Sequence, residues 1–277
     1  MSSQIQAIAQ ALLKESDPHV RRRMMETSSR AIYLPPIKEF ITSPNYANSK
    51  LWPAVARLLE LIDDPRVREF YLELAKGSGK SSGAAAGVVY AAARLAALKD
   101  PHEYFDIGKI KPITCLTCST SETQAIQTIF AQVKSWVRQN PFFIAAHRMC
   151  AERAEFPFSP DDPKYPAYKI HTTAITIRHS PVFPDGQIQI LCGHAKSEGM
   201  DGHDVFMAII DESNKHGLSE ESPQAQKLET TFRTSGFTRF PSDYKLGLIS
   251  SSVSKQSHLR KEVDRIFSAS PPQLLFH

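Results

Sequence analysis

The stretch 74–82 (LAKGSGKSS) constrains the fold of this 277-residue chain more than any other. It follows an apolar segment, 67–74, that predicts a short buried strand, and it precedes an alanine-rich segment, 83–98, that predicts a helix. A strand, a glycine-containing turn and a Lys-Ser pair at a helix start are the sequence context of a phosphate-binding loop. The first position of that motif is usually glycine, whereas here it is Leu74.

Each residue type in this loop has a chemical reason to be there. Glycines at positions 77 and 79 let backbone N–H groups turn inward around phosphate oxygens, and the helix start adds partial positive charge. Lys80 would reach the β- and γ-phosphates and assist catalysis, and the Ser81 hydroxyl would ligate Mg²⁺. The alternative is an ordinary strand-to-helix turn. The predicted ATP-binding residues are Ala75, Lys76, Gly77, Ser78, Gly79, Lys80, Ser81 and Ser82.

A second stretch, 205–212 (VFMAIIDE), is an apolar run that ends in two acids. In parallel α/β sheets, ligands gather at the carboxyl ends of the strands. Asp211 would therefore hold Mg²⁺, and Glu212 would polarise the water that attacks the γ-phosphate. Alone the pattern is weak, since many strands end in an acid. Together with the glycine loop it predicts a nucleoside triphosphatase.

A third strand is predicted at 245–249, and it runs into Ser250, Ser251 and Ser252. Hydroxyl groups at a strand end beside a γ-phosphate can sense that phosphate through hydrogen bonds. The alternative is a turn stabilised by serine side chains. Because these serines follow the two nucleotide motifs, we favour the sensing role.

Composition restricts the class of protein but not its partner. A hydrophobic content of 42% and a charged content of 22% are typical of a globular protein. The net charge of +4 is compatible with nucleic-acid binding and with many enzymes that bind none. No secretory signal precedes residue 17, and the apolar run 83–98 is too short for a membrane span. We therefore expect a cytosolic protein without a membrane partner.

The cysteines raise the question of a metal site. Cys115 and Cys118 have zinc-like spacing, but they lie inside a predicted strand, 112–118. No second pair completes four ligands, so buried thiols are the favoured interpretation. The triplet 21–23 (RRR) is interpreted as a solvated face, with phosphate contact as the alternative.

Periodicity predicts the remaining elements. We expect residues 141–168 to be irregular, and a hairpin to join strands 171–179 and 186–194. The predicted helices are 4–14, 51–62, a helix carrying core residues from 125 to 137, 221–233 and 258–266.

The order of these pieces resembles the N-terminal ATPase domain of the large terminase subunit of tailed bacteriophages. The resemblance covers nearly the whole chain, and each motif alone is generic to P-loop ATPases with an additional sheet strand and a catalytic glutamate. The matching segments are FITSPNYANSKLWP (40–53), AKGSGKSS (75–82), CLTCSTSETQAIQTIFAQVKSWV (115–137), KSEGMDGHDVFMAIIDES (196–213) and LGLISSS (246–252).

The resemblance implies an α/β fold of the P-loop, RecA-like class, in which helices flank a mostly parallel central sheet. Residues 1–65 would form a small helical N-terminal or lid region, and 66–277 the ATPase core. It also implies a motor in the host cytoplasm that uses ATP and Mg²⁺ to pump double-stranded viral DNA into a procapsid. Such motors work as a homo-oligomeric ring on the portal with a small terminase subunit, although the isolated domain could be monomeric.

Carried over residue by residue, Lys80 and Ser81 bind phosphate and metal, Asp211 binds metal and Glu212 is the catalytic carboxylate. Ser250, Ser251 and Ser252 become the coupling motif, and Lys76 stands where the family usually has a sensing arginine. The family's adenine-reading glutamine is absent near 51–53. Its finger arginine is also absent, since Met200 and Asp201 occupy those places, which leaves Lys196, Arg178 and Arg233 as finger candidates.

The family also carries a C-terminal nuclease domain, which would start near His277. The pair Asp161 and Asp162 is a poor substitute for a nuclease metal cluster, so we expect ATPase activity without DNA cleavage. Two other functions remain open. A helicase-like nucleic-acid translocase shares these motifs but usually needs a second RecA-like domain. A nucleotide-gated assembly scaffold would bind ATP with Glu212 idle.

Overall fold

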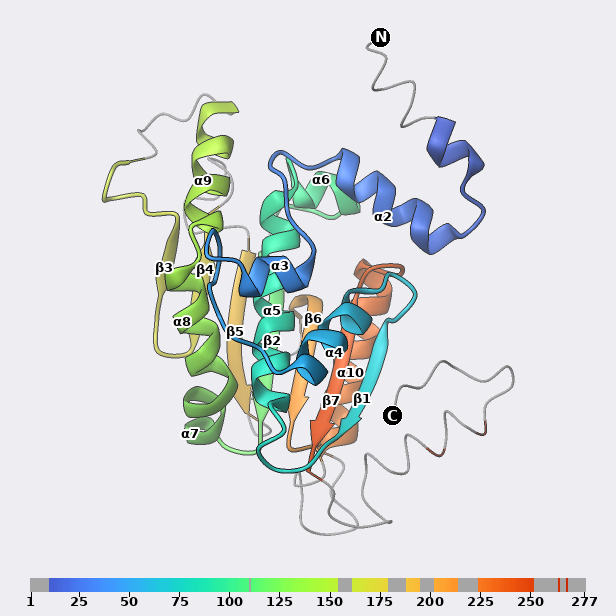
Figure 1. Cartoon of the computed structure of the whole chain (residues 1–277), viewed down its shortest axis with the longest axis vertical. Coiled ribbons are helices and arrows are strands. Elements are labelled where there is room, and N and C mark those ends of the chain that lie inside the picture. Colours follow the sequence, from blue (N-terminus) through green and yellow to red (C-terminus); the bar gives the residue numbers. More distant parts are fainter. Residues whose placement is uncertain are drawn as a thin grey trace.

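The computed structural model describes residues 10–109, 111–153, 161–178, 188–194, 202–213 and 224–251, and the single residues 264 and 268. Its described strands form one seven-stranded sheet in the order β1-β7-β6-β2-β5-β4-β3 (Figure 1). The strands are β1 (Glu69–Glu73), β2 (Ile113–Ser119), β3 (Tyr168–Ile170), β4 (Ala174–Ile177), β5 (Ile188–His194), β6 (Asp204–Asp211) and β7 (Lys245–Ser250).

Five neighbouring strands pair in parallel, in the order β1, β7, β6, β2 and β5. Strands β4 and β3 extend the sheet beyond β5 through antiparallel pairs. The strand that precedes the glycine loop, β1, does not touch the acid-ending strand β6, because β7 lies between them. One extra strand between these two is the arrangement expected for a P-loop ATPase with a catalytic glutamate. The predicted fold class is therefore confirmed.

Helices cover both faces of the sheet (Figure 1). The glycine-loop helix α5 lies on one face with α3, α4 and α8, and α10 packs on the other behind β6 and β7. The helices are α2 (Pro18–Ser28), α3 (Ile37–Thr42), α4 (Pro53–Asp63), α5 (Lys80–Ala97), α6 (Pro101–Phe105), α7 (Glu122–Ala125), a π-helical turn (Ile126–Phe130), α8 (Ala131–Gln139), α9 (Phe142–Arg153) and α10 (Gln224–Arg239).

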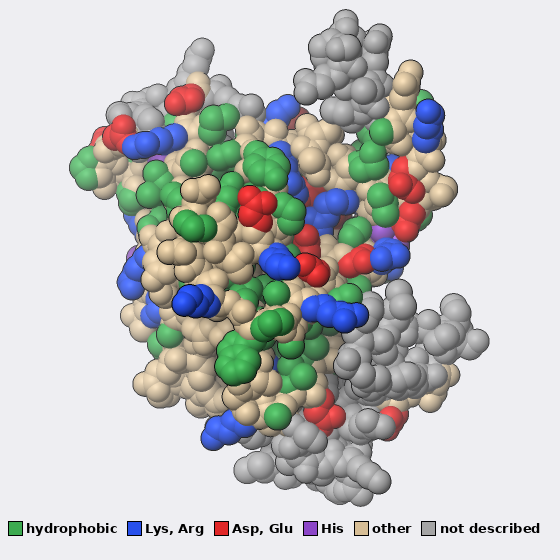
Figure 2. Space-filling view, in the orientation of Figure 1, with side chains coloured by type: hydrophobic (Ala, Val, Ile, Leu, Met, Phe, Trp, Pro, Cys, Tyr) green, Lys and Arg blue, Asp and Glu red, His purple; other side chains and the backbone are tan. Residues whose placement is uncertain are grey.

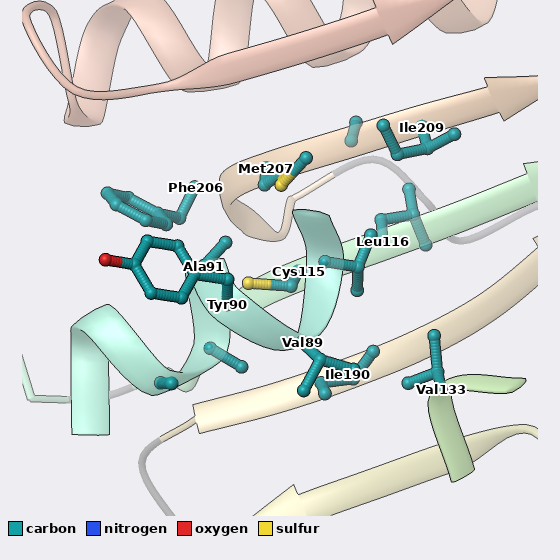
Figure 3. Packing of buried hydrophobic residues seen from close by; sticks show 14 of the residues in the cluster. Val89, Tyr90, Ala91, Cys115, Leu116, Val133, Ile190, Phe206, Met207 and Ile209 are labelled. Atoms are coloured by element: carbon teal, nitrogen blue, oxygen red, sulfur yellow. The ribbon is translucent and has the colours of Figure 1, made fainter. Parts of the chain in front are cut away.

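Helix α5 is the centre of the core, and nearly all of its side chains are buried. Its small residues allow close approach: a Cβ on Gly87 would lie 3.1 Å from the Met207 Cε atom of β6. Figure 3 shows Val89 of α5 beside Ile190 of β5, and Cys115 of β2 below Met207. Larger side chains along this helix would push it off the sheet, so the alanine-rich sequence positions the loop at its start.

The N-terminal helices share this core. Phe40 and Ile41 of α3 and Leu59 of α4 are fully buried in the same hydrophobic cluster as α5 and the sheet. The boundary between a lid region and an ATPase core, placed at residues 65 and 66, stays a prediction.

Most predicted elements are present with small shifts. The helix expected over 51–62 is α4, and the strands at 112–118, 205–211 and 245–249 are β2, β6 and β7. The hairpin is confirmed for its described part, since β4 and β5 pair antiparallel. Residues 10–14 of the first predicted helix are helical. The rest of that helix lies outside the described residues, as does almost all of the helix predicted at 258–266.

Two predictions were wrong. The region 141–168 is not irregular throughout, because it contains helix α9 and reaches strand β3. Helix α9 buries Phe142 and Phe143, and the Asn140 side chain accepts a hydrogen bond from the Phe142 backbone at its start.

The triplet 21–23 is not simply a solvated face either. Arg22 and Arg23 are partly buried in ion pairs to Asp243 and Asp63, at 3.1 and 2.8 Å. The helix predicted at 221–233 runs further, to Arg239.

Candidate nucleotide-binding site

The glycine loop links the end of β1 to the start of α5 at the lower edge of the sheet in Figure 1. Gly77 and Gly79 have φ values of +84° and +85°, a conformation that other residues rarely adopt. Gly79 is the residue immediately before the helix, and a Cβ there would lie 2.8 Å from Val55 Cγ2 of α4. Glycine is therefore required at position 79 both by the backbone conformation and by the neighbouring helix.

The strand register brings the other predicted residues to the same edge. Glu73 at the end of β1 pairs with Ser250 of β7, and Asp211 of β6 pairs with Ile249 of β7. The ends of the three strands therefore lie side by side. Lys80 is 7% exposed, and its ammonium donates to Ser251 Oγ at 2.7 Å and lies 3.8 Å from Glu212 Oε1.

Glu212 has an unusual backbone conformation, with φ +52°. Its N–H donates to Asp211 Oδ1 at 2.9 Å, and its carboxylate accepts from Ser250 Oγ at 3.5 Å and from Ser251 Oγ at 3.4 Å. A non-glycine residue with positive φ costs free energy, and such residues cluster at functional sites. The turn after β6 thus directs Glu212 toward the lysine and the two serines.

The residues fit a nucleotide with its metal on chemical grounds. The Ser78 hydroxyl in the loop is buried and has no hydrogen-bond partner in the described ranges of the chain, so a bound phosphate oxygen would satisfy it. Hydroxyl and carboxylate oxygens, as offered by Ser81 and Asp211, are the ligands that Mg²⁺ prefers. Asp211 is 2% exposed, so it is shielded from bulk water.

Several predicted residues gain no support from the structure. Ser252 and Lys196 lie outside the described residues. Arg178 is buried with its guanidinium 5.2 Å from the centre of the Tyr165 ring. Arg233 pairs with Glu229 and, at 2.8 Å, with Glu69 at the opposite end of β1. Both arginines have partners within the chain, so neither is singled out as a finger, and that role stays a prediction.

The base contact also stays open. The start of α4 lies against the glycine loop through Val55, and Trp52, directly before that helix, is 71% exposed. The described residues 49–53 contain no glutamine to read adenine.

The pair Cys115 and Cys118 consists of buried free thiols, as predicted. Burial raises the pKa of both thiols to about 12, so both are protonated at neutral pH. Among the described residues no group of three or more His, Cys, Asp or Glu side chains could hold a metal ion.

One buried residue at this edge was not among the predicted site residues. Ser119 is the last residue of β2, it is 2% exposed, and its hydroxyl has no hydrogen-bond partner among the residues that the structure describes. The helix cap is Ser121, whose hydroxyl accepts from the Gln124 backbone. A hydroxyl directly after a buried strand was the available signal, and it matches the pattern at Ser250.

A glycine loop at a helix start, an acid-ending strand and an extra strand between them define a P-loop nucleoside triphosphatase. A family model described as "Uncharacterized protein MJ0330, N-terminal P-loop domain" matches residues 60–266, and this chain belongs to that family. No curated protein sequence matches the chain.

Solved structures with the same fold include the HK97 bacteriophage large terminase. That structure is 15% identical with a TM-score of 0.57, over 87% of this chain and 43% of that one. A Thermus phage P74-26 large terminase ATPase domain is 16% identical with a TM-score of 0.47, over 78% of this chain and 70% of that one. S. cerevisiae dbp5 is 13% identical with a TM-score of 0.47, over 88% of this chain and 50% of that one. The fold expected from the sequence is therefore shared with the HK97 large terminase, and this chain spans less than half of that protein. No helix in the described part of the chain is long and apolar enough to cross a membrane.

Proposed function

We propose that this chain is the ATP-hydrolysing motor domain of a viral DNA-packaging terminase, which uses Mg²⁺-ATP to move double-stranded DNA into a procapsid. One observation carries the enzymatic part: the ammonium of Lys80, the carboxylate of Glu212 and the hydroxyl of Ser251 meet at the end of the sheet where the glycine loop begins α5. A passive phosphate-binding loop would not need a carboxylate at this place.

In the proposed reaction the loop N–H groups and Lys80 bind the β- and γ-phosphates and stabilise the charge that develops on them. Glu212 orients the attacking water and accepts its proton. The water oxygen bonds to the γ-phosphorus while the bond from that phosphorus to the β–γ bridging oxygen breaks, so ADP leaves with the electron pair. Mg²⁺, held by Ser81 and Asp211, supplies further neutralisation of phosphate charge when bound.

The serines after β7 suit a coupling role. Ser251 contacts both Lys80 and Glu212, at 2.7 and 3.4 Å, so it is placed to respond when the γ-phosphate is lost. The adjacent Ser250 is the last residue of β7, which pairs with β1 and β6. A shift of these serines would therefore pass to the strands that carry both nucleotide motifs.

The packaging role rests on the order of the sequence motifs and on the fold shared with the HK97 large terminase. Double-stranded DNA, a portal, a small terminase subunit, assembly as a ring and a location in the host cytoplasm belong to this proposal. A basic finger residue from a neighbouring subunit would complete the site. The candidates for this residue are Lys196, Arg178 and Arg233. Such residues contribute about 10³–10⁵-fold to turnover in other P-loop enzymes.

The test is phosphate release from Mg²⁺-ATP measured against protein concentration, with and without double-stranded DNA. We expect slow turnover whose specific rate rises with concentration and with DNA. Lys80→Ala should abolish it, whereas Lys76→Ala should leave a measurable rate. Turnover stimulated by single strands alone would favour a helicase-like translocase. Tight ATP binding without turnover under all conditions would favour a nucleotide-gated scaffold.

A further inference from the structure

Ser119 lies next to Asp211 across two neighbouring strands. In the β2–β6 ladder Cys118 pairs with Ile210, and each strand continues by one residue, to Ser119 and to Asp211. Residues paired in parallel strands project to the same side of the sheet. The two side chains are therefore neighbours at the edge where the glycine loop lies.

Both side chains point to the face that carries α5. Met207 of β6 contacts α5 at Gly87, and side chains alternate along a strand, so Asp211, four residues later, points the same way. Cys115 pairs with Met207, and Ser119 follows it by the same four residues. Because α5 begins with Lys80 and Ser81, its first turn faces this pair of side chains.

The Ser119 hydroxyl has no structural task. It is buried and makes no hydrogen bond within the described part of the chain. Two hydroxyls close to it in the sequence are engaged: Thr117 Oγ1 donates to the Leu191 carbonyl at 3.3 Å, and Thr120 Oγ1 bonds to Gln124 Oε1 at 2.8 Å. Alanine would fill the same place without leaving a buried hydroxyl unsatisfied, which normally costs stability. A hydroxyl kept under these conditions indicates a ligand.

We propose that the Ser119 hydroxyl binds a water molecule in the outer coordination shell of the Mg²⁺ held by Ser81 and Asp211. Ser119 is thus a positioning residue for the metal rather than a catalytic residue. Mg²⁺ in nucleotide sites keeps several of its waters, and protein groups that hold such outer-shell partners typically change metal affinity by about 10- to 100-fold. This inference rests on the proposed ATPase function, since it needs a nucleotide-bound metal.

The test measures metal-dependent nucleotide binding rather than turnover. The affinity of the full chain for the fluorescent analogue mant-ADP is determined with excess EDTA and with saturating Mg²⁺. We expect Mg²⁺ to tighten binding in the wild type. In Ser119→Ala the tightening of mant-ADP binding by Mg²⁺ should be roughly tenfold smaller, while the affinity in EDTA stays unchanged. Ser119→Thr keeps a hydroxyl and should restore most of the gain.

Thr117→Val is the matched control, because it removes a buried hydroxyl from the same strand and face, two residues away from the edge. It should leave the Mg²⁺ effect intact. Thermal unfolding without nucleotide should show Ser119→Ala at least as stable as the wild type. An unchanged Mg²⁺ effect in Ser119→Ala, or the same loss in Thr117→Val, overturns the inference while leaving the ATPase proposal standing. A wild type that neither binds mant-ADP nor hydrolyses ATP refutes both.

Discussion

The two ends of the central sheet differ in the distances between their buried, oppositely charged groups. At the end where the strands begin, Glu26 of α2 is 1% exposed and bonds to Arg94 of α5 at 2.5 Å and to Arg30 at 2.8 Å. At the end where the strands stop, Lys80 and Glu212 stand 3.8 Å apart. Charge-assisted hydrogen bonds are usually about 2.7–2.9 Å long. We call the first end closed, because Glu26 makes two ion pairs of 2.8 Å or less, and the second end open, because its Lys80–Glu212 pair is longer.

The closed end forms a charge cluster, which we define as Glu26, Arg22, Arg23, Arg94 and Asp243. Burial would raise the pKa of Glu26, but Arg94 and Arg23 outweigh it and hold that pKa well below its usual range. On the face seen in Figure 2, basic and acidic side chains lie next to one another in the region of α2 and α4. This cluster joins α2 to α5 and to the chain before β7. Its charges join parts of the fold, whereas we propose that those at the glycine loop bind a nucleotide.

The largest expected effect tests the open end. Glu212→Gln should lower single-turnover ATP hydrolysis by about 10²–10⁴-fold, because the amide cannot accept the proton of the attacking water. Stability should change little, since the contacts of the carboxylate with Lys80, Ser250 and Ser251 are long. Rapid-quench measurement of ADP formation, with ATP binding as the control, checks this. Unchanged turnover would remove Glu212 from the mechanism and make its end of the sheet structural as well.

The closed end should respond in the opposite way. Glu26→Ala should destabilise the fold by about 3–5 kcal/mol, because it leaves Arg94 buried without its short partner. Glu60→Ala is the matched control: Glu60 is exposed and 3.9 Å from Lys38, so its loss should cost roughly 0–1 kcal/mol. Urea unfolding provides both values.

The same cluster predicts acid sensitivity. Since the folded pKa of Glu26 is depressed, its stabilisation is present above its ordinary pKa of 4.5 and is lost progressively as the pH falls below that value. Glu26→Gln should flatten that part of the stability profile. Equal acid sensitivity of wild type and variant would show that Glu26 does not contribute.

The contrast between the ends also explains what could be predicted from the sequence. The open end is built from local patterns: a glycine loop between a strand and a helix, and polar residues directly after β6 and β7. Parallel strands bring such ends together, so the meeting of Lys80, Glu212 and Ser251 followed from three short segments. The extra strand between β1 and β6 followed from the resemblance.

The closed end could not be predicted, because its pairs join residues far apart in the chain. Glu26 meets Arg94 across 68 positions, and the arginine triplet beside it suggested a solvated face or a phosphate contact. Helix α9 was missed for a different reason. Asn140 and Pro141 offered a helix start, but the prolines that follow at positions 157, 160, 163 and 166 dominated the interpretation of the whole region. Ser119 was missed because a hydroxyl between a strand and a helix is also typical of a helix cap, the role that Ser121 has here.

A smaller effect is expected at Lys245, which borders the charge cluster. Its ammonium is buried and donates to the carbonyl oxygens of Asp64 and Val67. Burial, with the charges of Arg94 and Arg23, lowers the pKa of Lys245 to about 7. The unfolded chain therefore binds a proton that the folded one has released between pH 7 and the ordinary lysine value of 10.5. This lysine should add stability as the pH rises, by at most about 1.4 kcal/mol per unit.

Lys245→Met should remove that rise while lowering stability overall, since the two carbonyls lose their donor. Urea unfolding at intervals from pH 6 to about pH 9 measures the slope. A variant that keeps the wild-type slope would show that another group titrates there.

The smallest effect compares two glycines of the same loop. Gly77 and Gly79 share a positive φ, but a Cβ at Gly77 meets nothing within 4 Å, whereas one at Gly79 meets Val55 at 2.8 Å. Alanine at either position pays the backbone cost of roughly 1–2 kcal/mol. Gly79→Ala should cost about 1 kcal/mol more because of the added overpacking, and Val55→Ala in the same chain should recover that increment. Equal unfolding free energies for the two single variants would mean that α4 yields at this contact. The packing between the glycine loop and α4 would then accommodate an added methyl group without a measurable loss of stability.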